Sequence, residues 1–444
     1  MAGPRPDPPP DDGHSQQRVI RVGALARVEG EGALTIRLRD GAVEDVELRI
    51  FEAPRYFEAF LRGRPLEEVP DITARICGIC PVAYQMSSVH ALERALGITV
   101  SPEIRRLRRL LYCGEWIESH VLHMFLLHAP DFLGYDSGLE MAEKHGDVLK
   151  QALRLKKHGN ELLEVLGGRA IHPINVAVGG FYRCPRREEI QHLIPDFQWG
   201  LAAAVAATRW VAAFEFSEFD GGYEFVSLVH PDEYPMNEGM ITTSSGDAFS
   251  ADQYADAFEE RQVPHSTALH SLRKATGQPY FVGPLARLNL NRDRLFPTAR
   301  RLSDELNVGW PCTNPFKSIV ARGIEVVHAY EEALDILTNY RPAEPPRMPY
   351  EHRPAEGAAA TEAPRGTLYH RYAVDDQGKV TYARIVPPTS QNQAQIEDDL
   401  RRWAASVLSD DEAHTARLCE NFVRNYDPCI SCATHFLNVQ FDRV

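Results

Sequence analysis

The sequence predicts a mixed α+β fold that is dominated by helices. Residues 34–50 alternate between apolar and polar side chains, which is the period of a β-strand. From about residue 102 the apolar side chains recur at every third or fourth position, which is the period of a helix. The chain has 444 residues, so we expect two or three lobes or one large catalytic body.

The predicted β-structure lies near the N-terminus, within residues 18–50. Apolar side chains alternate along residues 34–38 and again along residues 46–50. Asp40-Gly41 between them is typical of a tight hairpin turn. We therefore expect an N-terminal β-hairpin region.

Long helices are predicted in the middle of the chain. An apolar stripe runs through residues 102–125, and a second segment at residues 148–166 is ended by Gly167-Gly168. Further helices are expected at about 198–216 and 321–339.

The C-terminal third is predicted to contain a loop, a second hairpin and one last helix. Residues 341–364 are rich in Pro, Ala and Glu, which favours a loop or excursion. Residues 369–374 and 380–385 flank a turn and read as a hairpin. The last helix is expected at about 393–407.

Composition excludes several classes of protein. The formal net charge is −14 and the sequence pI is about 5.7, which argues against a nucleic-acid-binding face. No apolar run approaches the roughly 20 residues of a membrane span. Residues 1–17 are rich in Pro and Asp and lack a signal-peptide pattern. We expect a disordered tail at 1–17 and a cytoplasmic protein.

Four of the eight cysteines form two C-x-x-C pairs. Cys77 and Cys80 lie in the segment RICGICP, and Cys429 and Cys432 lie in DPCISCATH. Two thiolates with this spacing can bind one metal ion, and two pairs can supply four sulfurs to one site. A structural zinc site and two separate redox dithiols remain alternative interpretations of the pairs alone.

The distance between the pairs bears on the zinc alternative. Zinc modules usually space their pairs by about 15–20 residues. Here one pair lies in the first quarter of the chain and the other near its end. Closing so long a loop costs on the order of 5 kcal/mol in chain entropy, which suits a large fold with a buried centre better than a small zinc clip.

The segments around the cysteines, taken in order, carry a family resemblance. The motifs are RVEG at 27–30, FEAFLRGR at 57–64, RICGIC at 75–80, GRAIHP at 168–173, EAPRG at 362–366 and DPCxxCxxH at 427–435. Together they resemble the nickel–iron hydrogenase large (alpha) subunit over about residues 20–440. The resemblance implies that family's fold, with a long-helix core, as one catalytic domain at 18–435.

The resemblance also implies the metal centre. Cys77 and Cys429 would be terminal nickel ligands, and Cys80 and Cys432 would bridge nickel to an iron that carries CO and CN ligands. Soft thiolates agree with such a late transition metal. The remaining cofactor-binding residues would be Pro364, Arg365 and Thr389.

Catalysis in the resembling family implies three residues: Cys429 as a ligand, Arg365 above the metals, and Glu29 as the first proton relay. A guanidinium stays charged and can stabilise developing charge, and a carboxyl can gain and lose a proton. A structural magnesium ion is also implied. Its ligands would be Glu58, His435 and a backbone carbonyl near Ile385.

The subclass implied is the cytoplasmic, multimeric, NAD(P)-linked or sulfhydrogenase type, because Tyr84 replaces the histidine of many members. The leftover cysteines form no Fe–S motif, and no G-x-G-x-x-G nucleotide motif follows a strand. We therefore expect no Fe–S cluster in this chain, an Fe–S small subunit as partner, and flavin- or NAD(P)-binding electron-transfer subunits. Maturation factors are also implied, and so is an endopeptidase that would remove residues 436–444, which follow His435.

Alternative functions remain open at this point. One is a hydrogenase-like subunit that serves another acceptor, such as ferredoxin, a deazaflavin or polysulfide. A hydrogenase-derived subunit of a proton-pumping complex would be expected to lack the cysteine pairs, and both pairs are present. The third is a zinc-stapled interaction protein.

Overall fold

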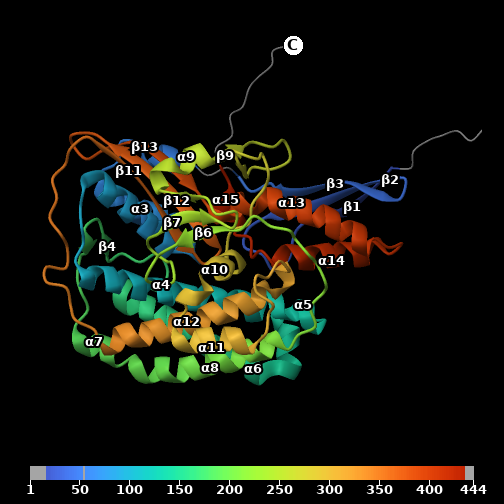
Figure 1. The fold of residues 1–444 in the computed structure, drawn as a ribbon, viewed down its shortest axis with the longest axis horizontal. Helices are drawn as coiled ribbons and strands as arrows, with labels where there is room; N and C mark the ends of the chain where they lie inside the picture. The colour runs from blue at the N-terminus through green and yellow to red at the C-terminus, as the bar shows by residue number, and fades with distance from the viewer. Residues whose placement is uncertain (1–16, 54–55, 436–444) are drawn as a thin grey trace, which may run out of the picture.

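The computed structural model describes residues 17–53 and 56–435. The extension predicted at 436–444, and the predicted tail except for Gln17, lie outside the described residues. Figure 1 shows a layer of long helices beneath a layer that holds the sheets, with the N-terminal strands extending to one side. Among the described helices, none has the length and apolar character needed to cross a membrane.

The N-terminal sheet confirms the predicted hairpin and adds a strand to it. The strands β1 (Gln17–Val22), β2 (Gly32–Arg39) and β3 (Ala42–Ile50) are antiparallel in that order. Asp40 and Gly41 both take positive φ angles, 52° and 80°. A tight hairpin turn needs these angles, and the Asp-Gly pair adopts them readily.

The four predicted long helices are present in the helical layer, as α4 (Pro102–Leu122), α6 (Gly138–Gly167), α8 (Ile194–Ala212) and α12 (Ser318–Thr338). Helix α4 packs on both α6 and α12, and α12 packs on α8 (Figure 1). Helix α6 begins at Gly138 rather than near residue 148, because a kink at His145 joins two helical pieces.

The prediction of a loop throughout residues 341–364 was wrong at its C-terminal end. Residues Ala355–Ala363 form strand β11, which joins β12 (Gly366–Val374) and β13 (Val380–Val386) in an antiparallel sheet. Strand β11 packs against helix α3 (Pro81–Leu96). A Cβ atom on Gly357 would lie 2.5 Å from the backbone nitrogen of Ala95. The strand is therefore rich in small residues because a helix backbone lies directly against it.

The prediction that residues 393–407 form the last helix was also wrong. That helix is α13 (Pro388–Val407), and α14 (Glu412–Arg424) and the short α15 (Ile430–Ala433) follow it. The Asp411 side chain accepts a hydrogen bond from the His414 N–H group (3.0 Å), which caps α14.

Short elements connect these layers. The helices are α1 (Phe57–Leu61), α2 (Val69–Thr73), α5 (Ala129–Leu133), α7 (Arg187–Gln191), α9 (Tyr254–Ala257), α10 (Pro284–Asn291) and α11 (Pro297–Glu305). The strands are β4 (Val176–Ala177), β5 (Gly180–Phe181), β6 (Val226–Val229), β7 (Met240–Thr243), β8 (Ala248–Phe249), β9 (Phe258–Arg261) and β10 (His270–Arg273).

One large buried cluster joins residues from both ends of the chain, from Ile20 to Cys432. The core thus brings the distant cysteine pairs to one interior place.

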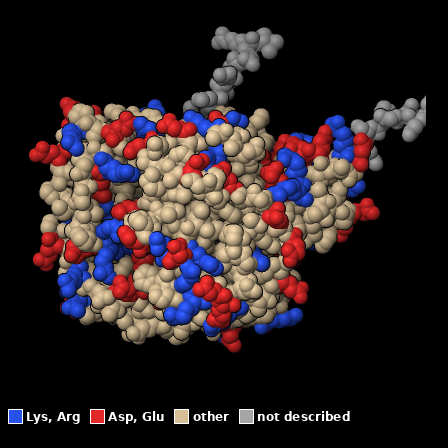
Figure 2. Space-filling model, in the orientation of Figure 1, with Lys and Arg blue, Asp and Glu red and all other residues tan. Residues whose placement is uncertain are grey.

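Basic and acidic side chains are intermixed on the face drawn in Figure 2 and do not form a continuous basic stripe there.

Candidate metal centre

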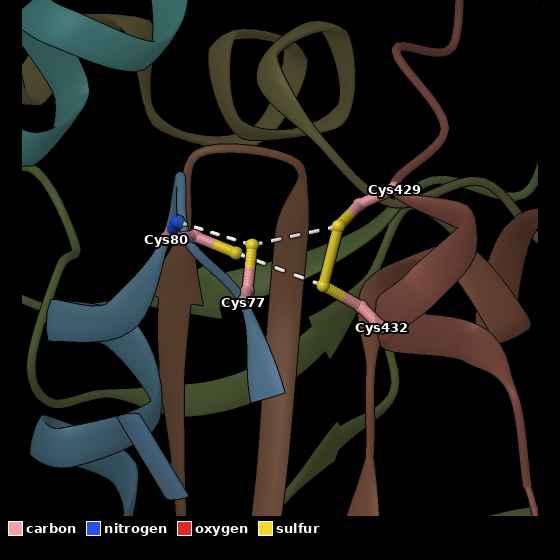
Figure 3. A group of neighbouring side chains, drawn as sticks. All are labelled: Cys77, Cys80, Cys429 and Cys432. Carbon is pink, nitrogen blue, oxygen red and sulfur yellow. Dashed lines mark hydrogen bonds between the residues drawn. A yellow bond between two sulfur atoms is a disulfide. The ribbon is translucent and has the colours of Figure 1, made fainter. Parts of the chain in front are cut away.

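The four paired cysteines meet in the interior, although 352 residues separate Cys77 from Cys429. The Sγ atoms of Cys77 and Cys429 are 3.6 Å apart, and those of Cys80 and Cys432 are 3.9 Å apart (Figure 3). All four sulfurs lie within 4.8 Å of one another, and all four residues are buried. Cys429 and Cys432 are joined as a disulfide in the structure, so binding by four thiolates requires this bond to be reduced.

The first pair is held by the start of helix α3. Cys80 is the N-cap residue of that helix, and the N–H groups of Ile79 and Cys80 point at Cys77 Sγ at 3.3 and 3.2 Å. The buried carboxylate of Glu115, on α4, accepts hydrogen bonds from the N–H groups of residues 82 and 83. This contact fixes the turn that carries both sulfurs.

The second pair is held by contacts with distant segments. The Cys429 N–H group donates to Thr389 Oγ1 (3.0 Å) at the start of α13. Residues 29 and 429 form an isolated parallel bridge, and the Ile430 N–H group donates to the carbonyl of Glu29 (2.9 Å). The contact between Thr389 and this cysteine is thus made by the backbone N–H group of Cys429.

Arg365 lies beside the sulfurs with a free donor. Its side chain is 2% exposed, Nε donates to the Asp427 carbonyl (2.8 Å), and Nη2 donates to the Asp427 carboxylate (3.1 Å). Nη1 is buried and has no hydrogen-bond partner among the described residues. Burial opposes the charge, but Asp427 and the thiolates of Cys80 and Cys77 raise the pKa of Arg365 above its ordinary value.

These residues fit a nickel–iron centre. Four thiolates are a soft donor set that suits late transition metals, although they also suit zinc. A buried, charged guanidinium with an unused N–H group suits an acceptor ligand on a metal, such as cyanide. A zinc ion with four cysteine ligands would offer that group no acceptor beyond the sulfurs.

Glu29 contacts the centre directly. Its Oε2 atom lies 3.0 Å from Cys429 Sγ and accepts a hydrogen bond from the Ser431 N–H group (3.1 Å). The residue is partly exposed. A carboxylate between a buried sulfur and the solvent side can take up a proton from that sulfur.

Glu58, Ile385 and His435 meet at a second place nearby. Glu58 Oε1 lies 3.3 Å from His435 Nε2, and it accepts a hydrogen bond from the Ile385 N–H group (2.8 Å). The three residues line a cavity of about 200 Å³ that also reaches Cys432. Since the amide of Ile385 contacts Glu58, the predicted carbonyl ligand stays a prediction.

Three supporting residues were not found by sequence reasoning: Glu115, Asp427 and Arg287. Asp427 precedes Cys429 in the quoted motif, so its place was a usable signal. Arg287 had none. It is fully buried, pairs with two buried glutamates (325 and 362), and donates to the Pro364 carbonyl (2.9 Å). Pro364 is therefore held by Arg287, which positions the neighbouring Arg365.

The fold and this buried four-cysteine centre define a metalloenzyme of the hydrogenase type. A family model described as nickel-dependent hydrogenase matches residues 55–151 and 274–435. The chain belongs to the nickel-dependent hydrogenase family and is its large-subunit type.

Individual relatives agree with this membership. The chain is 37% identical to sulfhydrogenase 1 subunit alpha of Pyrococcus furiosus, over 95% of this chain and 98% of that protein. It is 34% identical to sulfhydrogenase 2 subunit alpha of the same organism, over 95% and 100%. The solved structure of an NAD+-reducing nickel–iron hydrogenase in its H2-reduced state matches with a TM-score of 0.83 at 29% identity, covering 95% of this chain and all of that one.

Proposed function

We propose that this chain catalyses the reversible oxidation of hydrogen to protons and electrons at a nickel–iron centre. The observation that carries the proposal is that four buried cysteine sulfurs meet close to the charge of Arg365, whose Nη1 atom has no hydrogen-bond partner within residues 17–53 and 56–435. When bound, the centre would supply an open coordination position and two metals that take up electrons.

The cysteines would divide the ligand work. Cys77 and Cys429 would bind nickel as terminal ligands, and Cys80 and Cys432 would bridge nickel to iron. Arg365 would donate through Nη1 to a cyanide ligand of that iron, because Nε and Nη2 already donate to Asp427. Its fixed positive charge would also stabilise negative charge that develops at the centre.

Glu29 would take the proton from Cys429. The 3.0 Å separation between its Oε2 atom and Cys429 Sγ supports direct transfer. The backbone bridge between the two residues holds the carboxyl at that sulfur. Thr389 would support the same cysteine by accepting a hydrogen bond from the backbone N–H group of Cys429.

A magnesium ion at Glu58 and His435, with the carbonyl of Ile385, is the second part of the proposed cofactor set. The cavity of about 200 Å³ beside them offers room for an ion with bound water. The ion would support the C-terminal segment that carries Cys432, since His435 follows it by three residues.

Electrons would leave through partner subunits. The proposed partners are an Fe–S small subunit and flavin- or NAD(P)-binding subunits, in the cytoplasm, with dedicated maturation factors. The similarity to an NAD+-reducing enzyme supports NAD(P) as acceptor. The names of the two sulfhydrogenase relatives favour a second candidate, a sulfur acceptor such as polysulfide.

Metal analysis of the assembled enzyme tests the proposal. We expect one nickel and one iron per copy of this chain beyond the iron of the partner's clusters, together with infrared bands from CO and CN. Zinc alone, without nickel, would refute the proposal. Reduction of NAD+, NADP+ and polysulfide under hydrogen then separates the two acceptor candidates.

A further inference from the structure

Three potential metal ligands lie together outside the cysteine centre. They are His265, His270 and Glu397, named here the HHE cluster. His270 begins strand β10 and Glu397 lies on helix α13, which pack against each other. The three ligand atoms lie within 4.8 Å of one another. The side chains are only 19%, 9% and 12% exposed.

The carboxylate of Glu397 is already oriented by the backbone. Its Oε1 atom accepts hydrogen bonds from the Leu48 N–H group (2.8 Å) and from His265 Nε2 (2.7 Å). Its Oε2 atom faces His270 Nδ1 at 3.9 Å, which is too long for a hydrogen bond. Two atoms that bind the same ion through bonds of about 2.1 Å lie roughly 3–4 Å apart, which is the separation found here.

We propose that the HHE cluster binds one divalent transition cation, such as Zn²⁺. Two imidazoles and one carboxylate are a donor set that such ions prefer over Mg²⁺. The contact from Leu48 to Oε1 is the kind of outer hydrogen bond that orients a ligating carboxylate. Oε2 of Glu397 and Nδ1 of His270 face each other across 3.9 Å, which is where the ion would bind.

The protonation states agree with this geometry. Burial lowers the pKa of His270, so the ring is neutral and can bind a metal. The hydrogen bond to Glu397 raises the pKa of His265, so an incoming cation must displace its proton. A cavity of about 320 Å³ lies beside His265, and a cation that entered through it would pass three arginines (Arg21, Arg37 and Arg49) as well as Glu47.

The position of the cluster indicates what the ion would do. Between the two histidines, the Thr267 carbonyl accepts a hydrogen bond from the His435 N–H group (2.9 Å), and Ala268 pairs with Thr434. The ion would tie this loop to α13, the helix that also contacts Cys429 through Thr389. The ion would therefore stabilise the loop that pairs with residues 434 and 435, and it would take no part in turnover.

Cobalt titration of the assembled enzyme tests the proposal. After chelator treatment, with nickel and iron measured in the same sample, we expect one further Co²⁺ equivalent and its visible d–d absorption. Alanine at His265 or His270, or Glu397→Gln, should weaken this binding at least about tenfold, because loss of an outer partner alone costs that much. His352→Ala is the matched control, since His352 also pairs with a glutamate carboxylate, that of Glu67, and is no part of the HHE cluster.

The results that overturn the proposal are distinct from failure of the cysteine centre. No further Co²⁺ equivalent, or unchanged binding in His265→Ala and Glu397→Gln, would overturn it. Binding that is lost in Glu58→Gln instead would also overturn it, because the cobalt would then occupy the Glu58 site. Glu397→Gln keeps an acceptor for Leu48, so this variant tests the site even if His270→Ala does not fold.

Discussion

Replacing Glu29 by Gln should stop proton transfer and leave the metal centre assembled. Gln keeps the shape and can still accept the hydrogen bond from the Ser431 N–H group, which Glu29 now accepts at 3.1 Å. The bridge between residues 29 and 429 uses only backbone atoms, so the substitution leaves it in place. The change therefore removes the titrating group and little else.

The expected loss is about 100- to 10,000-fold in hydrogen–deuterium exchange, which is the usual contribution of a positioned acid–base group. This corresponds to roughly 3–5 kcal/mol of barrier. The lower limit of the expected loss, about 100-fold, applies if Glu52 takes over part of the proton transfer. Ser431 Oγ donates to its carboxylate at 2.9–3.0 Å, so a second proton acceptor lies one residue contact away.

Exchange between H2 and D2O, followed by mass spectrometry, measures this step without any electron acceptor. Nickel and iron contents are determined on the same samples. Glu31→Gln is the matched control, because Glu31 is an exposed glutamate two residues along the chain. A Glu29→Gln enzyme with full metal content and normal exchange would show that another group accepts the proton.

Four further predictions concern ligation, hydrogen bonding by Arg365, electrons and processing. Cys429→Ser should abolish hydrogen uptake, because a hydroxyl is a poor ligand for these metals; a fully active variant would remove Cys429 from the ligand set. Arg365→Lys should lower kcat about 100- to 1,000-fold with metals retained, because the three donors of an ammonium share one nitrogen and cannot reproduce the planar guanidinium that contacts Asp427 through two nitrogens and presents a third; unchanged kcat would argue against the hydrogen-bonding role of the guanidinium. The isolated, metal-loaded chain should reduce neither dye nor nicotinamide continuously, and sustained turnover without partners would contradict the expected electron path. Intact-mass measurement of the active enzyme should find a chain that ends at His435, and active protein that retains residues 436–444 would refute processing.

The fold could be predicted where apolar and polar residues recur with a regular period in the sequence. Strand β3 alternates between buried and more exposed residues, so its period is visible. Helix α4 is buried from Leu107 to Val121, but charged residues such as Arg108 and Glu115 interrupt its apolar positions and leave a period in the sequence. Helix α3 and strand β11 were not identified because nearly every residue in them is buried, which removes the period. Their assignments depend on each other, since the small residues of β11 exist to fit the backbone of α3.

The candidate site could be predicted where its residues lie in short motifs. The cysteine pairs, Glu29 and Arg365 belong to such motifs, and the fold brings them together. Glu115 and Arg287 lie on other helices and act through tertiary hydrogen bonds, Glu115 to residues 82 and 83 and Arg287 to Pro364. Nothing in their local sequence distinguishes them from other buried charged residues, so only the three-dimensional structure identifies their roles.

The two halves of the cysteine centre differ in what holds them, and from this difference we expect an order in which the site assembles. Cys77 and Cys80 sit on the turn that begins α3, and Glu115 from the adjacent core fixes that turn. Cys429 is supported by contacts from distant segments, at Glu29 and Thr389. The first pair can therefore form a half-site as soon as the helical core folds, whereas the second completes it only when the C-terminal segment docks. Metal entry is easiest before docking, because all four sulfurs are buried afterwards.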